Sequence, residues 1–124
     1  MPSQIQSYKD MIVWQQAMDL VVAVYAATKC WPKEEIYGLT SQARRATISI
    51  PANIAEGFAR ENRGSYKQFL RIAQGSLKEL ETHLLIAQGI GITDREATMN
   101  LLGQAESIGK LFRRLIRKLS GEQS

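Results

Sequence analysis

The sequence predicts an all-α protein that folds as an up-and-down four-helix bundle. Apolar residues recur at three- and four-residue steps in four long segments, and no segment shows the alternation of a β-strand. Short loop-like stretches separate these segments, and a chain of 124 residues can bury one core. We expect a single domain over residues 1–124, with helices over about 10–30, 39–60, 65–88 and 93–119.

The first predicted helix begins at Asp10, whose carboxylate is expected to accept hydrogen bonds from the amides of the first turn. It ends at Trp31, because a residue before proline is disfavoured in the helical conformation. Its spacing places six residues on one face, which we expect to be buried: Val13, Ala17, Leu20, Val21, Val24 and Thr28.

The second predicted helix is small and apolar nearly all round in its middle, ATISIPANIAEGFA. Such a helix is usually covered by more than one neighbour, one of which can belong to another subunit. Pro51 lies inside this segment and is expected to kink the helix, with Thr47 or Ser49 bonding back to a preceding carbonyl. The alternative is that two helices meet at Pro51.

The third predicted helix begins at Ser65 as N-cap and ends in the glycines of residues 89–91. Gly75 lies mid-helix, where it is expected to let another backbone approach closely. The fourth helix opens with a T-x-x-E capping box formed by Thr93 and Glu96.

The composition indicates a protein of the cytoplasm. No apolar run approaches the roughly 18 residues needed to span a bilayer, and the first ten residues lack the features of a signal peptide. The single cysteine, Cys30, cannot form an internal disulfide. The net charge of +4 is modest, so the placement of the charges matters more than their number.

The inventory of reactive side chains does not favour an enzyme. A di-iron carboxylate bundle needs two Glu-x-x-His motifs, but His83 is the one histidine and Leu80 stands three residues before it. Glu79 and His83 are expected to form a surface ion pair. Cys30 is expected to be a small buried thiol, because its possible base, His83, is remote in sequence. We expect no metal, no cofactor and no catalytic residue.

The basic residues of the fourth helix are more informative. They fall at three- and four-residue steps, opposite an apolar face, and no acid lies between Ser107 and Ser120. Cations near a helix C-terminus are favourable in themselves, but that effect suits two residues better than five. The expected nucleic-acid-binding residues are Lys110, Arg113, Arg114, Arg117 and Lys118, with Arg44 and Arg45 from the second helix and Arg60 and Arg63 nearby. Two hypotheses stay open: an oligomeric scaffold that binds RNA or DNA non-specifically, and a protein-interaction scaffold with no nucleic-acid role.

Three stretches resemble one family: VWQQAMDL, EEIYGLTSQARRATISIPANIAEGFAR and FLRIAQGSLKELETHLLIA. They are similar to four-helix bundle proteins encoded within intervening sequences of bacterial large-subunit ribosomal RNA genes, over residues 8 to 90. The resemblance implies a homopentamer. A related family is the accessory variability determinant of diversity-generating retroelements, a pentameric bundle that binds nucleic acid and a reverse transcriptase.

The signature residues of the resemblance suit structure better than chemistry. We expect Pro51, Asn53, Glu56 and Gly57 to fix packing or subunit register. Asn53 and Glu56 stand three apart on the apolar helix and would need hydrogen-bond partners once buried.

Overall fold

The structure, a computed structural model, describes residues 5–121 of the chain. Residues 1–4 and 122–124 of the expected domain lie outside the described residues. Within residues 5–121 the regular structure is helical throughout, and it confirms the all-α prediction. The elements in order are the 3₁₀-helix η1 (Tyr8–Asp10), α1 (Ile12–Thr28), the 3₁₀-helix η2 (Lys33–Glu35), α2 (Leu39–Phe58), α3 (Arg63–Gly89) and α4 (Arg95–Leu119).

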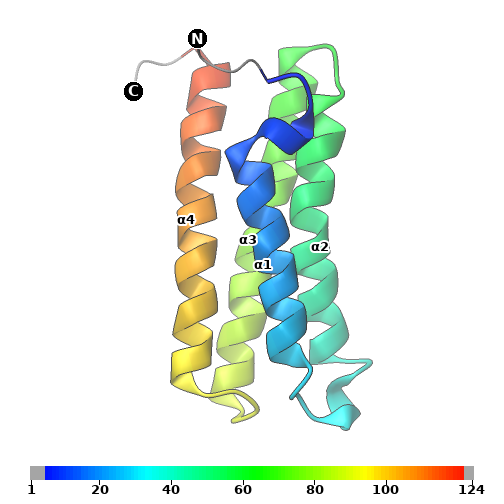
Figure 1. Cartoon of the computed structure of the whole chain (residues 1–124), viewed down its shortest axis with the longest axis vertical. Coiled ribbons are helices and arrows are strands. Elements are labelled where there is room, and N and C mark those ends of the chain that lie inside the picture. Colours follow the sequence, from blue (N-terminus) through cyan, green and yellow to red (C-terminus); the bar gives the residue numbers. More distant parts are fainter. Residues whose placement is uncertain (1–4, 122–124) are drawn as a thin grey trace.

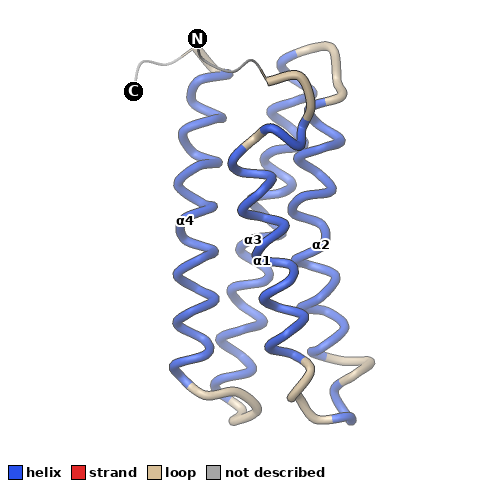
Figure 2. Tube along the Cα trace, viewed as in Figure 1, coloured by secondary structure: helices blue, strands red, loops and turns tan. Residues whose placement is uncertain are grey.

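The four long helices run up and down beside one another (Figure 1). Each helix packs against two others: α1 and α3 flank α2, and α4 closes the bundle by packing on both α3 and α1. Short connections join the helices, as the tan segments of Figure 2 show. The start of α1 and the end of α4 therefore lie at one end of the bundle, together with the α2–α3 connection.

The core is the set of apolar side chains that the four helices turn inward. On α1, the expected face is buried at five of its six positions, while Val21 is half-buried. On α4, Ile108 and Phe112 are fully buried, and Leu111, Leu115 and Leu119 pack against them from the edge. The helical periodicity of the sequence therefore locates the core correctly. The largest fully enclosed side chains are Phe112, Leu20, Ile50, Ile54, Leu70, Leu77, Leu80, Leu84 and Ile108.

The predicted N-cap of the first helix is wrong. Asp10 ends η1, where its carboxylate accepts from the backbone amides of Gln6 and Ser7 at 3.1 Å. Ser7 completes this capping box by accepting from the amide of Lys9. The chain thus makes one tight turn before α1, and α1 itself begins after Met11 without a side-chain cap.

Two further caps belong to neighbours of the predicted residues. Asn62, rather than Ser65, caps α3, and its Oδ1 accepts from the amide of Ser65 at 2.7 Å. Asp94, rather than Thr93, caps α4, and its Oδ1 accepts from the amide of Ala97 at 2.7 Å. Each cap satisfies an amide that the first helical turn leaves without an intrahelical partner.

The glycine-rich end of α3 behaves as predicted. Gly91 follows the helix with φ of 84°, a conformation that favours glycine. The amide of Gly91 donates to the carbonyl of Gln88, and that of Ile92 donates to the carbonyl of Ala87 at 3.1 Å. These two bonds satisfy carbonyls of the last turn and reverse the chain toward α4.

The α2 helix continues through Pro51 as one element, so the alternative of two helices is wrong. The predicted back-bonds differ from those observed. Ser49 Oγ lies 2.8 Å from Ser76 Oγ of α3, and Asn53 Nδ2 donates to both the carbonyl and the Oγ of Ser49. Thr47 Oγ1 is buried with no hydrogen-bond partner. The bond back to a preceding carbonyl therefore comes from Asn53 rather than from Thr47 or Ser49, while Ser49 links α2 to α3.

Two glycines have opposite surroundings. A Cβ on Gly57 would lie 2.8 Å from the Cβ of Phe69 and 3.2 Å from the carbonyl oxygen of Tyr66. Gly57 therefore permits the close approach of α2 and α3. A Cβ on Gly75 would meet nothing within 4 Å, so the predicted close backbone approach at Gly75 is wrong within one chain.

Candidate nucleic-acid interface

The five basic residues of α4 form a surface that we call the α4 stripe: Lys110, Arg113, Arg114, Arg117 and Lys118. All five are exposed. The inward-turned residues between them, Phe112 and Ile116, are buried, which fixes the rotation of the helix and turns the cations outward. The α4 stripe occupies the orange-to-red end of α4 in Figure 1.

The sequence-predicted basic residues of α2 do not join the α4 stripe. Arg44 and Arg45 lie near the start of α2, at the opposite end of the bundle from the end of α4 (Figure 1). The guanidinium of Arg44 stacks over the ring of Tyr25 at 4.6 Å, and its Nε donates to Thr28 Oγ1 at 2.9 Å. These contacts give Arg44 a role in packing α2 on α1. Arg45 is exposed beside Glu79 in a surface hollow.

Of the two predicted basic residues at the α2–α3 connection, Arg60 contacts other side chains of the chain. Arg60 donates to Glu56 Oε2 at 2.9 Å and stacks over the ring of Phe69 at 4.6 Å. Because both partners of this ion pair are substantially exposed, the pair contributes little to stability. Arg63 is exposed at the first position of α3.

The structure also brings cations from α3 beside the α4 stripe, and these residues were not predicted from the sequence. Lys67, Arg71 and Lys78 recur at steps of four and seven, so they share one face of α3. Lys67 Nζ reaches Ser120 Oγ at 3.4 Å, which ties the start of α3 to the end of α4. Arg71 and Lys78 line a surface groove with Arg113. Their spacing, with no acid between Arg63 and Lys78, was the signal that could have revealed them.

Comparisons with known proteins agree with this architecture. A family model described as 23S rRNA-intervening sequence protein matches residues 9–114. The chain belongs to this family. No curated protein matches the chain.

The solved structures that resemble this chain include a member of the S23 ribosomal protein family from Bacteroides thetaiotaomicron VPI-5482, described as a protein with unknown function. The TM-score is 0.77 at 21% sequence identity, and the alignment covers 86% of this chain and 99% of that one. At this identity the likeness shows the shared fold alone.

The residues that carry the family resemblance have distinct environments in α2. Pro51 and Gly57 are buried, and Gly57 makes the close contact with α3 described above. Asn53 is half-buried and reaches the Ser49 side chain that meets α3. Glu56 is exposed on the surface of α2 in the single chain. Its partner is Arg60 one turn later.

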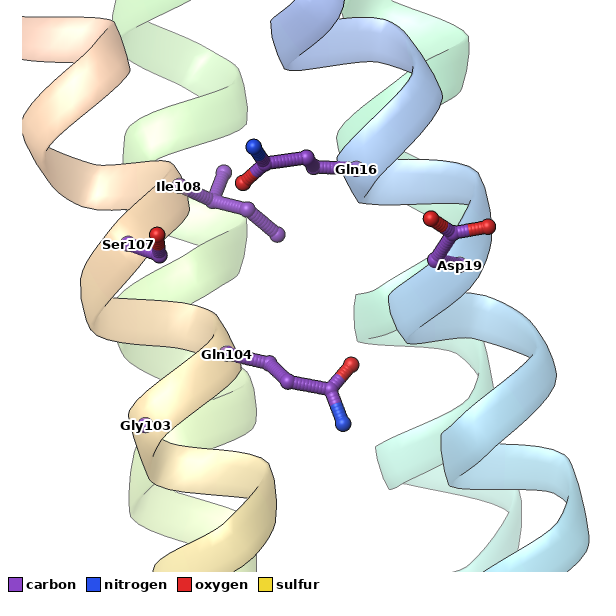
Figure 3. A pocket seen from close by; sticks show the side chains of 6 residues that line it. All are labelled: Gln16, Asp19, Gly103, Gln104, Ser107 and Ile108. Carbon is purple, nitrogen blue, oxygen red and sulfur yellow. The ribbon is translucent and has the colours of Figure 1, made fainter.

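A second hollow of about 480 Å³ lies between α1 and α4. Gln16 of α1 and Gln104 of α4 extend into it, as Figure 3 shows, and Asp19 of α1 also lines it. Its polar lining holds one carboxylate and no histidine, cysteine or cation. Because no cation lines this hollow, it offers no charged partner for a phosphate.

The remaining reactive side chains are isolated. Cys30 is exposed, so the expectation of a buried thiol is wrong; it follows the end of α1, outside the helical core. His83 is buried with both ring nitrogens lacking a hydrogen-bond partner, although its Nε2 lies 3.5 Å from Glu79 Oε2. Its burial differs from the expected surface pair, because α3 turns His83 inward and leaves Glu79 exposed.

Metal-ligating and membrane-spanning features are absent from the described part of the chain. Residues 5–121 contain no group of three or more His, Cys, Asp or Glu side chains that could hold a metal ion. Among the same residues, no helix combines the length and apolarity required to cross a bilayer.

Proposed function

We propose that the protein is a non-enzymatic, oligomeric helical scaffold whose α4 stripe binds the phosphates of RNA or DNA without reading base sequence. The observation that carries this proposal is the exposure of all five cations on one end of α4. Phosphate contacts of lysine and arginine dominate the affinity of such surfaces, and they position nucleic acid without discriminating among bases.

The surface of α2 supports self-association. Ile48, Ala52, Ala55 and Ala59 recur at steps of four, three and four, so they form one apolar row along α2. Ile48, Ala52 and Ala59 are exposed and Ala55 is half-buried, although α1 and α3 already flank this helix. A second copy of the chain is the occupant that we propose for this row. The family resemblance implies five copies, and a ring would repeat the α4 stripe and add avidity.

The test is the salt dependence of binding to a labelled RNA duplex and a labelled DNA duplex, using protein freed of nucleic acid by a high-salt wash. Light scattering gives the mass of the same sample. Replacing Lys110, Arg113 and Arg114 with glutamine should reduce the slope of log affinity against log salt by about 0.9 for each duplex phosphate that the variant no longer neutralises. The matched control replaces, also with glutamine, three exposed cations at the opposite end of the bundle: Lys29, Lys33 and Arg95.

Equal slopes for the two triple variants would reject the assignment of the α4 stripe, because both lose the same charge. Binding that is absent even at low salt would reject the nucleic-acid function as a whole. A monomeric mass would reject the assembly and leave the stripe to be judged on its slope alone.

A second function is favoured by an apolar groove between the start of α1 and the end of α4. Met11, Ile12, Leu111 and Leu115 line it, and Ile12 is 62% exposed. Asp10 and two residues of the α4 stripe, Arg114 and Lys118, also line it. We propose, as the competing function, that this groove holds an apolar segment of a protein partner. Capture of such a partner at high salt, together with absence of duplex binding, would favour this scaffold over the nucleic-acid one.

A further inference from the structure

The surface between α3 and α4 contains a groove of about 370 Å³ on the basic side of the bundle. Arg71, Gln74 and Lys78 form its α3 wall, and Arg113 stands on the α4 wall. Every charged residue that lines this groove is a cation. Two different helices therefore contribute positive charge to one depression, which a single stripe on α4 cannot do.

The middle of the groove is open to a ligand. Gly75 lines it and is exposed, and a Cβ on Gly75 would meet no atom within 4 Å. Gly109 lies across from it on α4 and is buried. A Cβ on Gly109 would lie 3.5 Å from Nη1 of Arg113, so the Arg113 guanidinium extends back over this glycine on the α4 wall. The absence of a side chain at Gly75 lets a bulky anionic group come close to the surface of α3 beside the cations.

Another cation of α3 extends the positive charge beyond the groove, toward the end of α4. Lys67 lies one turn before Arg71 and is held near the end of α4 by its contact with Ser120. On the other side, Lys78 pairs with Glu81 at 3.2 Å, with the lysine side chain 72% exposed. The Glu81 side chain is 20% exposed, but the ammonium group of Lys78 is on the solvent side, so solvent weakens the pair and the lysine can exchange its carboxylate for a phosphate.

The shape and lining indicate which nucleic acid would fit. No aromatic side chain lines the groove, so it lacks the stacking platforms that hold unpaired bases. From Lys67 to Lys78 the α3 helix rises roughly 16 Å, at about 1.5 Å per residue. That length corresponds to about five base-pair steps along a duplex axis, at about 3.4 Å each. The lining is therefore suited to the phosphate backbone of a duplex rather than to unpaired bases.

We propose that the groove between α3 and α4 holds the phosphate backbone of a double-stranded nucleic acid, with Arg71 and Lys78 on one wall and Arg113 on the other. This inference rests on the proposed nucleic-acid function and extends it to α3. The α4 stripe then forms one side of the binding surface, and the α3 cations form the other. RNA and DNA duplexes share the chemistry that the groove would recognise.

The experiment places a carboxylate inside the groove by Gly75→Glu. The new side chain has space, and it lies four residues after Arg71 and three before Lys78, so it can neutralise either cation. We expect duplex affinity at low salt to fall about fivefold, the factor that corresponds to like charges about 4 Å apart in water. We also expect the salt slope to drop by about 0.9 for each phosphate that the groove no longer neutralises.

The matched control is Gly103→Glu. Gly103 is also exposed, a Cβ there would also meet nothing within 4 Å, and it lies in the middle of α4 on the side of the α1–α4 hollow in Figure 3. The substitution adds the same charge and removes the same kind of helical glycine. Less than a twofold change in affinity is expected. Circular dichroism and light scattering establish that both variants keep the fold and the mass of the original protein.

The outcomes separate the groove from the broader function. Equal affinities for the two variants, while the α4 triple variant still loses binding, would overturn the groove and leave the proposed function standing. Binding of a single strand as tightly as a duplex of the same sequence would also overturn the groove. A selective loss in Gly75→Glu with either an RNA or a DNA duplex supports it and identifies the preferred duplex.

Discussion

Gly57 offers the sharpest test of how α2 and α3 pack. Substitution by alanine would place a Cβ 2.8 Å from the Cβ of Phe69 and 3.1 Å from the Cδ1 of Tyr66. The Cβ of Phe69 is fixed to the α3 backbone, so the clash cannot be relieved by a side-chain rotation alone. The two helices must separate, which is overpacking with a typical cost of about 1–3 kcal/mol.

Replacing Gly57 with alanine also raises helix propensity, which is favourable, so a second glycine-to-alanine variant is needed to isolate the cost of the clash. Replacing a helical glycine with alanine stabilises a helix interior by about 1 kcal/mol. Gly75→Ala gains this amount without a clash, because its Cβ would have open space. Gly57 lies in the last turn of α2, where the gain is no larger. The difference between the two variants therefore equals the packing cost or exceeds it.

The measurement is the free energy of unfolding in urea, followed by far-UV circular dichroism at one protein concentration. We expect Gly57→Ala to be less stable than Gly75→Ala by at least about 1–3 kcal/mol. A single concentration is needed because association shifts apparent stability by mass action. Equal free energies of unfolding would refute the reasoning, since they would mean that α2 and α3 do not approach as closely as the structure shows.

Two further predictions concern residues at the helix contacts. Arg44→Gln should lower the free energy of unfolding by about 1–2 kcal/mol, through loss of the stacking on Tyr25 and the bond to Thr28, and should leave the salt slope of duplex binding unchanged. A changed slope with unchanged stability would instead place Arg44 at the nucleic-acid surface. Burial raises the pKa of Tyr66 above its ordinary value of 10.0, so the folded state holds this proton more tightly than the unfolded state. The resulting stability is present below pH 10 and is lost as the pH rises through the pKa of the folded state. When the thermal midpoint is measured against pH, Tyr66→Phe should lack this part of the alkaline decrease. Identical alkaline decreases in the two proteins would contradict this.

The helices could be predicted from the sequence because periodicity is a property of each segment alone. Leu39 begins α2 and Leu119 ends α4, as expected. The caps could not be assigned in the same way. Near the start of α1, Ser7 and Asp10 cap each other in a separate turn, and near α3, Asn62 and Ser65 both carry side chains capable of capping. The choice depends on the direction from which the chain enters each helix.

The part of the candidate interface on α4 could be predicted from the sequence, but the part that α3 and α4 form together could not. The α4 stripe follows from the spacing of its own residues. Recognising Arg71 and Lys78 requires knowledge of which face of α3 adjoins α4, and that is set by packing across the bundle. Arg44 illustrates another effect of packing that spacing does not reveal, because its guanidinium lies over the ring of Tyr25 and takes part in the contact between α2 and α1.

The order of the helices around the bundle has a consequence for how the protein folds. Except for the closure between α1 and α4, the contacts between long helices join neighbours in sequence. Such local contacts favour rapid folding, because little loop-closure entropy is lost before they form. Both walls of the basic groove belong to one helical hairpin, residues 63–119. This surface therefore depends on contacts within a single contiguous stretch of chain.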